Sequence, residues 1–141
     1  MKHKETVLLV EDDATVRSVL SEQLSGFGYR CIAAANAIDA TQIIEANLFR
    51  LDLLVTDIKM PGALDGLALA EKVRALQPDV AILLISGYPD APVMTSADAH
   101  GYRVLAKPFR QSQLEAAVAE ELGRRGASVV SLDEARDKNR S

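Results

Sequence analysis

Cysteine is almost missing from this chain: Cys31 is the only one among 141 residues. One cysteine cannot form a disulfide within the chain, so no disulfide framework holds the fold together. Cys31 lies in an apolar run, and this position favours a buried strand residue over a reactive thiol.

A leader and a long apolar run are missing as well. Residues 1–5 lead directly into a short apolar strand, without the features of a signal peptide. No apolar run approaches the roughly 20 residues that cross a bilayer. We therefore expect a soluble cytoplasmic protein with no membrane segment.

An excess of positive charge is also lacking. The 16 Lys and Arg residues against 20 Asp and Glu residues give a net charge of −4. This balance argues against nucleic-acid binding by the chain as a whole, because such binding needs a basic surface. Hydrophobic residues make up 48% and are spread along the chain, so a globular domain with one core is expected.

Five short apolar runs punctuate the sequence. We predict strands at residues 6–10, 30–34, 51–57, 80–85 and 102–106. The runs are continuously apolar rather than alternating, which is typical of strands covered on both faces of a sheet.

Helical periodicity fills the intervals between these runs. Apolar residues recur at helical spacing at Val16, Val19, Leu20, Leu24 and Phe27, at Ala40, Ile43, Ile44 and Leu48, at Leu69, Val73 and Leu76, and at Leu114, Val118 and Leu122. Asn36 and Asp39 form a plausible cap for the second helix, and Gly123 is expected to end the last one. Residues 89–100 hold two prolines and few apolar residues, so a short or irregular helix is expected there.

The alternation of strands and helices predicts an α/β fold. Five strands joined by helical crossovers form a doubly wound parallel sheet with helices on both faces. Residues 124–141 lie outside the pattern and are rich in charge, so we expect a flexible tail after a domain spanning residues 1–123.

Acidic, hydroxyl and basic residues stand where these strands end. They are Glu11, Asp12, Asp13, Asp57, Ser86 and Lys107. The carboxyl ends of strands in such a sheet meet at one edge, where clustered carboxylates would repel one another. Oxygen ligands of this kind favour Mg²⁺, and a lysine with a hydroxyl suits a phosphate. The set predicts phosphoryl transfer, with a carboxylate able to act as nucleophile.

Four motifs together carry a family resemblance. Val10-Glu11-Asp12-Asp13, Asp57-Ile58-Lys59-Met60-Pro61-Gly62 with Asp65-Gly66, Ser86-Gly87 and Lys107-Pro108-Phe109 resemble the receiver domain of two-component response regulators. The resemblance extends over residues 5–122. It implies a flavodoxin-like, CheY-like sheet order of 2-1-3-4-5 and a stand-alone receiver that works in phosphorelay signal transduction.

The resemblance also implies roles for single residues. Asp57 matches the phosphoacceptor, and Glu11 with Asp12 matches the acid pair that binds Mg²⁺ or Mn²⁺, with Arg17 at the usual distance from Asp12. Asp13 falls outside the pair and is expected to cap a helix. The backbone carbonyl of Lys59 would complete the metal shell.

Further matches concern the phosphoryl group and the switch. Ser86 matches the hydroxyl switch residue, Lys107 matches the lysine that contacts the phosphoryl group, and Pro108 matches a proline whose peptide bond is typically cis. Val104 stands where the family often has an aromatic residue, while Tyr102 comes two residues earlier. Val104, Tyr102, Tyr88 and the side chain of Lys59 are therefore candidate modulators of switching or dephosphorylation.

The implied partners are a sensor histidine kinase or histidine phosphotransfer protein and an unknown downstream protein, with the chain itself a monomer or weak dimer. We expect no DNA-binding domain and no enzymatic turnover beyond self-phosphorylation and slow self-dephosphorylation. Two alternatives remain. A haloacid-dehalogenase-type phosphatase would have a second aspartate two residues after the nucleophile, where this chain has Lys59. A silent interaction module would keep the fold without being phosphorylated.

Overall fold

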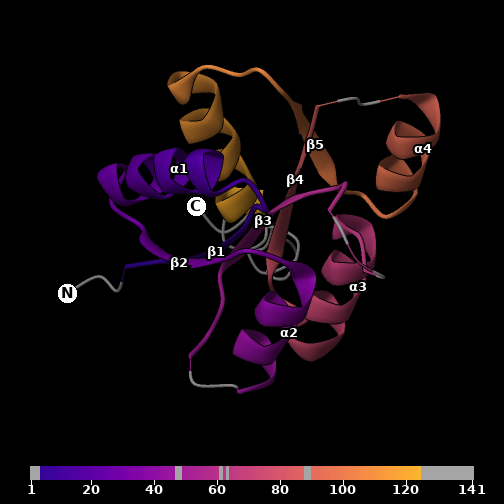
Figure 1. Ribbon diagram of the computed structural model, residues 1–141, viewed down its shortest axis with the longest axis horizontal. Coiled ribbons are helices and arrows are strands. Elements are labelled where there is room, and N and C mark those ends of the chain that lie inside the picture. The colour runs from indigo at the N-terminus through magenta and orange to yellow at the C-terminus, as the bar shows by residue number, and fades with distance from the viewer. Residues whose placement is uncertain (1–3, 47–48, 61, 63, 88–89, 125–141) are drawn as a thin grey trace, which may run out of the picture.

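The computed structural model describes residues 4–46, 49–60, 62, 64–87 and 90–124. In this part of the chain, five parallel strands form one sheet in the order β2-β1-β3-β4-β5, with helices on both faces (Figure 1). The elements are β1 (Thr6–Val10), α1 (Ala14–Gly26), β2 (Arg30–Ala34), α2 (Ala37–Glu45), β3 (Leu53–Asp57), α3 (Gly66–Leu76), β4 (Ala81–Ser86), α4 (Ala91–Ala99) and β5 (Arg103–Ala106). The chain is helical again over residues 111–124. The predicted fold class and strand order are confirmed.

Each central strand contributes residues alternately to two cores, because successive side chains of a strand point to opposite faces. Leu8 of β1 packs in the core that α2, α3 and α4 cover. Leu9 packs in the other core, beneath α1 and the helix at residues 111–124. Figure 1 shows α1, in purple, and the last helix, in orange, on one side of the sheet. Helices α2 and α3 lie on the other side. Burial on both faces explains the continuous apolar runs of the sequence.

Capping side chains begin the helices at the predicted places. The Asp39 amide donates to Asn36 Oδ1 at 2.8 Å, which confirms the predicted cap of α2. The α4 helix is short, as expected, but it is a regular α-helix of nine residues capped by Asp90. Pro92 lies in its first turn, where a missing amide donor costs no helical hydrogen bond.

Several predictions about single positions are wrong. Val19 and Leu76 were expected on apolar helix faces, but they are 46% and 48% exposed. Each lies at the margin of its helix's buried stripe, where periodicity alone does not distinguish core from solvent. Cys31 is half-buried, because β2 is an edge strand of the sheet. Gly123 lies inside the last helix, which continues through residue 124.

Two expectations concern residues outside the described part of the chain. Residues 125–141 are among them, so the flexible tail and the domain boundary stay predictions.

Among the helices that the structure describes, none combines the length and apolar character needed to cross a membrane.

Candidate functional site at the carboxyl edge of the sheet

Four strand ends bring the predicted site residues to one edge of the sheet. Glu11 and Asp12 follow β1, Asp57 is the last residue of β3, and Ser86 is the last residue of β4. Lys107 follows β5, the neighbour of β4. The strands are parallel, so their carboxyl ends share this edge, as predicted.

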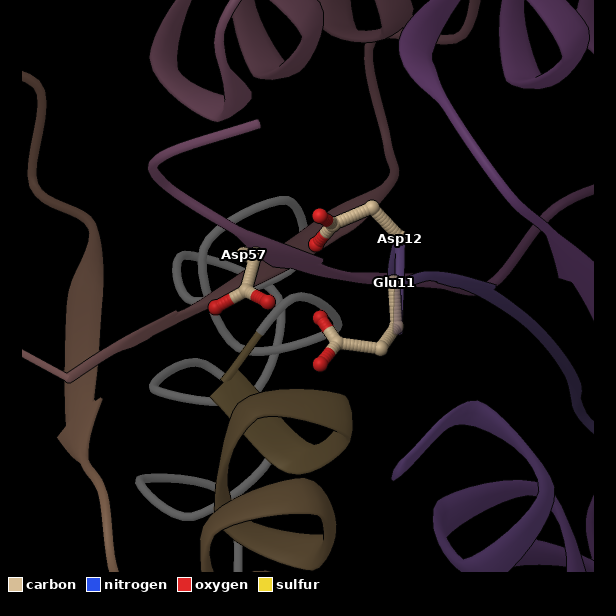
Figure 2. Close-up of side chains that lie close together, drawn as sticks. All are labelled: Glu11, Asp12 and Asp57. Atoms are coloured by element: carbon tan, nitrogen blue, oxygen red, sulfur yellow. The ribbon is translucent and has the colours of Figure 1, made fainter. Parts of the chain in front are cut away.

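Three carboxylates converge there (Figure 2). One carboxylate oxygen from each of Glu11, Asp12 and Asp57 lies within 4.8 Å of the other two. Glu11 is 3% exposed and Asp57 is 8% exposed, whereas Asp12 lies open to solvent. Two carboxylates of the cluster, those of Glu11 and Asp57, are therefore buried, and the third, that of Asp12, is accessible to solvent.

The neighbouring Asp13 has a different role. Its Oδ1 accepts a hydrogen bond from the Val16 amide at 3.0 Å, and it is the N-cap of α1. A capping carboxylate satisfies amides that the helix start leaves unpaired. The predicted cap at Asp13 is thus confirmed, and metal binding by Glu11 and Asp12 stays a prediction.

Lys107 supplies the positive charge at the site. Its Nζ lies 3.1 Å from Asp57 Oδ2 and 3.2 Å from Glu11 Oε1. The Lys107 amide donates to the Ser86 carbonyl at 2.8 Å, which ties the loop after β5 to the end of β4. The peptide bond between Lys107 and Pro108 is cis, as the resemblance implied.

Burial sets the electrostatics of Asp57. Loss of solvent raises the pKa of its carboxyl above the ordinary value, while the hydrogen bond and the positive charge of Lys107 act in the opposite direction. Lys107 pairs with two of the three clustered carboxylates, so negative charge remains in excess in the cluster when all three are ionised. A divalent cation would relieve this excess.

The donor set fits Mg²⁺. Glu11, Asp12 and Asp57 offer only hard oxygen ligands, and the exposure of Asp12 leaves room for water and a phosphate oxygen. Mn²⁺ accepts the same ligands. The side chain of Lys59 is exposed, and the contribution of its carbonyl to a metal shell stays a prediction.

A close backbone approach shapes the loop after Asp57. The Gly66 amide donates to the Ile58 carbonyl at 2.7 Å, and Asp65 caps α3 by accepting from the Ala68 amide. A Cβ atom at Gly66 would lie 2.0 Å from the Asp57 carbonyl oxygen. Only glycine lets the start of α3 approach the end of β3 this closely.

Ser86 lies beside the phosphoacceptor candidate. Asp57 pairs with Ile85 in the sheet, and Ser86 is the next residue of β4. Its side chain is buried, with 4% of the residue exposed. The location agrees with a switch residue, and contact between its hydroxyl and a phosphoryl group stays a prediction.

The candidate modulators lie in different surroundings. Val104 is half-buried against the core that includes Leu84, its partner on β4. Tyr102 is buried just before β5, where its hydroxyl donates to Glu71 Oε1 at 3.3 Å on α3. Tyr102 therefore lies at the amino-terminal end of β5, whereas Ser86 lies at the carboxyl edge of the sheet. Tyr88 lies outside the described residues.

Two contacts were missed from the sequence. Arg17 served only as a spacing marker, yet its Nη1 donates to the Glu11 carbonyl at 2.8 Å. Its position four residues after the cap Asp13 was the available signal, since one helical turn returns a long side chain to the helix start. The second contact joins His100 to α3, where its Nε2 lies 2.7 Å from Glu71 Oε1.

Comparison with known proteins agrees with this geometry. The family model described as "Response regulator receiver domain" matches residues 7–119. The response regulator receiver protein CpdR of Brucella abortus is 34% identical over 109 residues, which cover 77% of this chain and 88% of that protein. The sensor kinase CckA of the same organism is 35% identical over 118 residues, which cover 83% of this chain.

Solved structures give the same result. The CheY-like response regulator receiver domain protein of Methanospirillum hungatei is 26% identical, with a TM-score of 0.81, and the match covers 89% of this chain and 99% of that one. The chain spans only 12–23% of the length of three larger curated relatives. Fold, site and family model agree, and the chain belongs to the response regulator receiver domain family.

Proposed function

We propose that the chain accepts a phosphoryl group on Asp57 in a Mg²⁺-dependent reaction and signals through phosphorylation-dependent binding of a partner or onward transfer. The observation that carries this proposal is the cluster of Glu11, Asp12 and Asp57 with Lys107 Nζ 3.1 Å from Asp57. Receiver-family membership supports a histidine kinase or a histidine phosphotransfer protein as the phosphoryl donor.

The chemistry assigned to these residues is a single group transfer. A carboxylate oxygen of Asp57 attacks the phosphorus of a phosphohistidine, the new O–P bond forms an acyl phosphate, and the donor's N–P bond breaks. Lys107 is positioned to pair with the charge on the transferred group. A bound Mg²⁺ would offset the negative charge of the carboxylates and the phosphoryl oxygens.

In this proposal the protein is a phosphoryl carrier rather than an enzyme that turns over a free substrate. The match that covers 88% of the CpdR receiver protein supports a receiver acting on its own, with output through a separate protein. Phosphorylation then biases an equilibrium between two conformations of the domain.

Intact-mass measurement tests the proposal. The protein is incubated with Mg²⁺ and acetyl phosphate, and wild type is compared with Asp57→Asn and with the control Asp13→Asn, whose asparagine can still cap α1. We expect one phosphoryl adduct on wild type and on the control, none on Asp57→Asn, and none in EDTA. Donor hydrolysis without an adduct would instead support a phosphatase, and no reaction would support a silent interaction module.

A further inference from the structure

Arg17 joins helix α1 to the acid pair of the site. It lies in the first turn of α1, and its Nη1 donates to the carbonyl oxygen of Glu11 at 2.8 Å. We propose that Arg17 is a positioning residue that holds Glu11 and Asp12 in the arrangement that binds a divalent cation. This inference rests on the proposed function and adds to it a residue outside the predicted metal-binding set.

The Glu11 backbone is held from two sides. Its amide donates to the Ala34 carbonyl at the end of β2 at 3.1 Å, and its carbonyl accepts from Arg17 of α1. The Glu11 carbonyl and the Asp12 amide belong to one planar peptide unit. A hydrogen bond that fixes this carbonyl therefore also fixes the direction in which the chain enters Asp12.

Asp12 needs this support more than the other two acids do. Glu11 and Asp57 are buried, and their carboxylates already contact Lys107. Asp12 is exposed, and it lies between the held peptide of Glu11 and the cap formed by Asp13. Its carboxylate reaches the cluster in Figure 2 because the backbone on both sides of it is anchored.

The charge of Arg17 acts against this role. A positive charge near a helix start is unfavourable for the helix dipole, and it repels a divalent cation that binds to neighbouring carboxylates. A purely electrostatic effect of Arg17 therefore weakens cation binding, whereas positioning strengthens it. The two effects have opposite signs, so a substitution distinguishes them.

The experiment measures Mg²⁺ affinity in the phosphoryl-free protein by calorimetric titration. Arg17→Met removes the donor and the charge but keeps the apolar stem, and Arg17→Lys keeps the charge with a shorter side chain. The matched control is Arg50→Met, because the Arg50 side chain is 71% exposed and this variant changes the net charge equally. Circular dichroism establishes that each variant is folded.

We expect Arg17→Met to raise the Mg²⁺ dissociation constant about tenfold, as is typical for the loss of a group that orients metal ligands. Arg17→Lys should give an intermediate value, and Arg50→Met should match wild type. Without metal, exchange of the Glu11 amide, which donates to the Ala34 carbonyl, should be faster in Arg17→Met than in wild type. This readout does not depend on cation binding.

Each remaining outcome has one meaning. Unchanged or tighter Mg²⁺ binding by Arg17→Met, beside normal binding by wild type, would overturn the inference and leave the proposed function intact. Failure of wild type to bind Mg²⁺ would count against the proposed function itself. If Arg17→Met does not fold, Arg17→Lys decides: affinity equal to wild type with faster exchange of the Glu11 amide contradicts the positioning role.

Discussion

Asp57 combines burial with a negative charge. It is 8% exposed at the end of β3, and its carboxylate contacts Lys107. Burial raises its pKa, and the lysine offsets part of this effect. A charged carboxylate in such a place costs folding stability, which is a common feature of functional sites.

Because burial raises the pKa of Asp57, the stability difference between Asp57→Asn and wild type should depend on pH. A carboxyl whose pKa is raised by folding binds its proton more tightly in the folded state, so stability falls as the pH rises from the unfolded-state pKa through the folded-state pKa. In EDTA at neutral pH, we expect Asp57→Asn to be more stable than wild type by on the order of 1 kcal/mol. The gain should disappear below about pH 4, where the unfolded carboxyl also becomes protonated.

Urea unfolding at a series of pH values measures this difference. Asp13→Asn serves as the control, because Asp13 is exposed and an asparagine retains the cap. A gain in stability that stayed constant from acid to neutral pH would show that the ionisation of Asp57 is not its source.

Close packing of elements sets the local constraints around the site. The start of α3 lies directly against the end of β3, and Gly66 is the point of contact. At the other end of the domain, His100 and Tyr102 connect the turn between α4 and β5 to α3 through Glu71. The Gly66 contact places the start of α3 beside the end of β3, and the Glu71 contacts link α3 to the C-terminal end of α4.

Gly66→Ala should destabilise the domain strongly. Its Cβ would lie 2.0 Å from the backbone oxygen of Asp57, so the helix start or the loop must shift. We expect a loss of about 2–4 kcal/mol, as for other overpacked buried positions. Gly26→Ala is the matched control, since a Cβ there meets nothing within 4 Å. Equal stability of the two variants in thermal unfolding would contradict the close approach.

His100 links the C-terminal end of α4 to α3. Its Nδ1 faces the Ser96 carbonyl at 2.9 Å, and its Nε2 faces the Glu71 carboxylate at 2.7 Å. Both partners offer oxygen acceptors to the ring. Tyr102 and Arg74 also face this group, through ring stacking and a cation–π contact on the tyrosine.

We therefore expect His100→Gln to lower the hydrogen-exchange protection factors of α4 by about two- to fivefold, a small effect because the ion pair is half exposed. Protection of α1 amides is the internal control. Identical α4 protection in both proteins would show that this contact does not restrain the helix.

If the acidic cluster binds Mg²⁺ as proposed, the stability of the whole domain should depend on this ion. A ligand that binds only the folded state stabilises it by mass action, by about 2.7 kcal/mol at a concentration of 100 times its dissociation constant. For a domain of this size, such a gain raises the melting temperature by several degrees. We expect this rise with Mg²⁺ and its reversal with EDTA.

Asp12→Asn should abolish this Mg²⁺-dependent rise without harming the apo fold, because Asp12 is exposed, whereas Asp13→Asn should keep it. Differential scanning calorimetry with and without Mg²⁺ measures both variants. An equal rise in Asp12→Asn would place the stabilising ion elsewhere on the protein.

The amino-acid sequence by itself determined the fold class, the strands and the positions of the acidic residues at strand ends. Local signals suffice for these features: continuous apolar runs mark strands buried on both faces, and Asn36 with Asp39 marks a helix start. Parallel strands then bring their carboxyl ends to one edge of the sheet. The proximity of Glu11, Asp12 and Asp57 therefore follows from the strand pattern alone.

Only the tertiary structure decided which side chains contact one another across elements. The exposure of Val19 and Leu76, the contact of Arg17 with Glu11, and the pairing of His100 with Glu71 depend on how helices are rotated and placed on the sheet. Periodicity fixes which residues share a face, but packing between elements fixes where that face ends and which partner lies opposite it. For the same physical reason, the sequence predicted a site at Asp57, and only the fold showed that Arg17 holds the backbone of its acid pair.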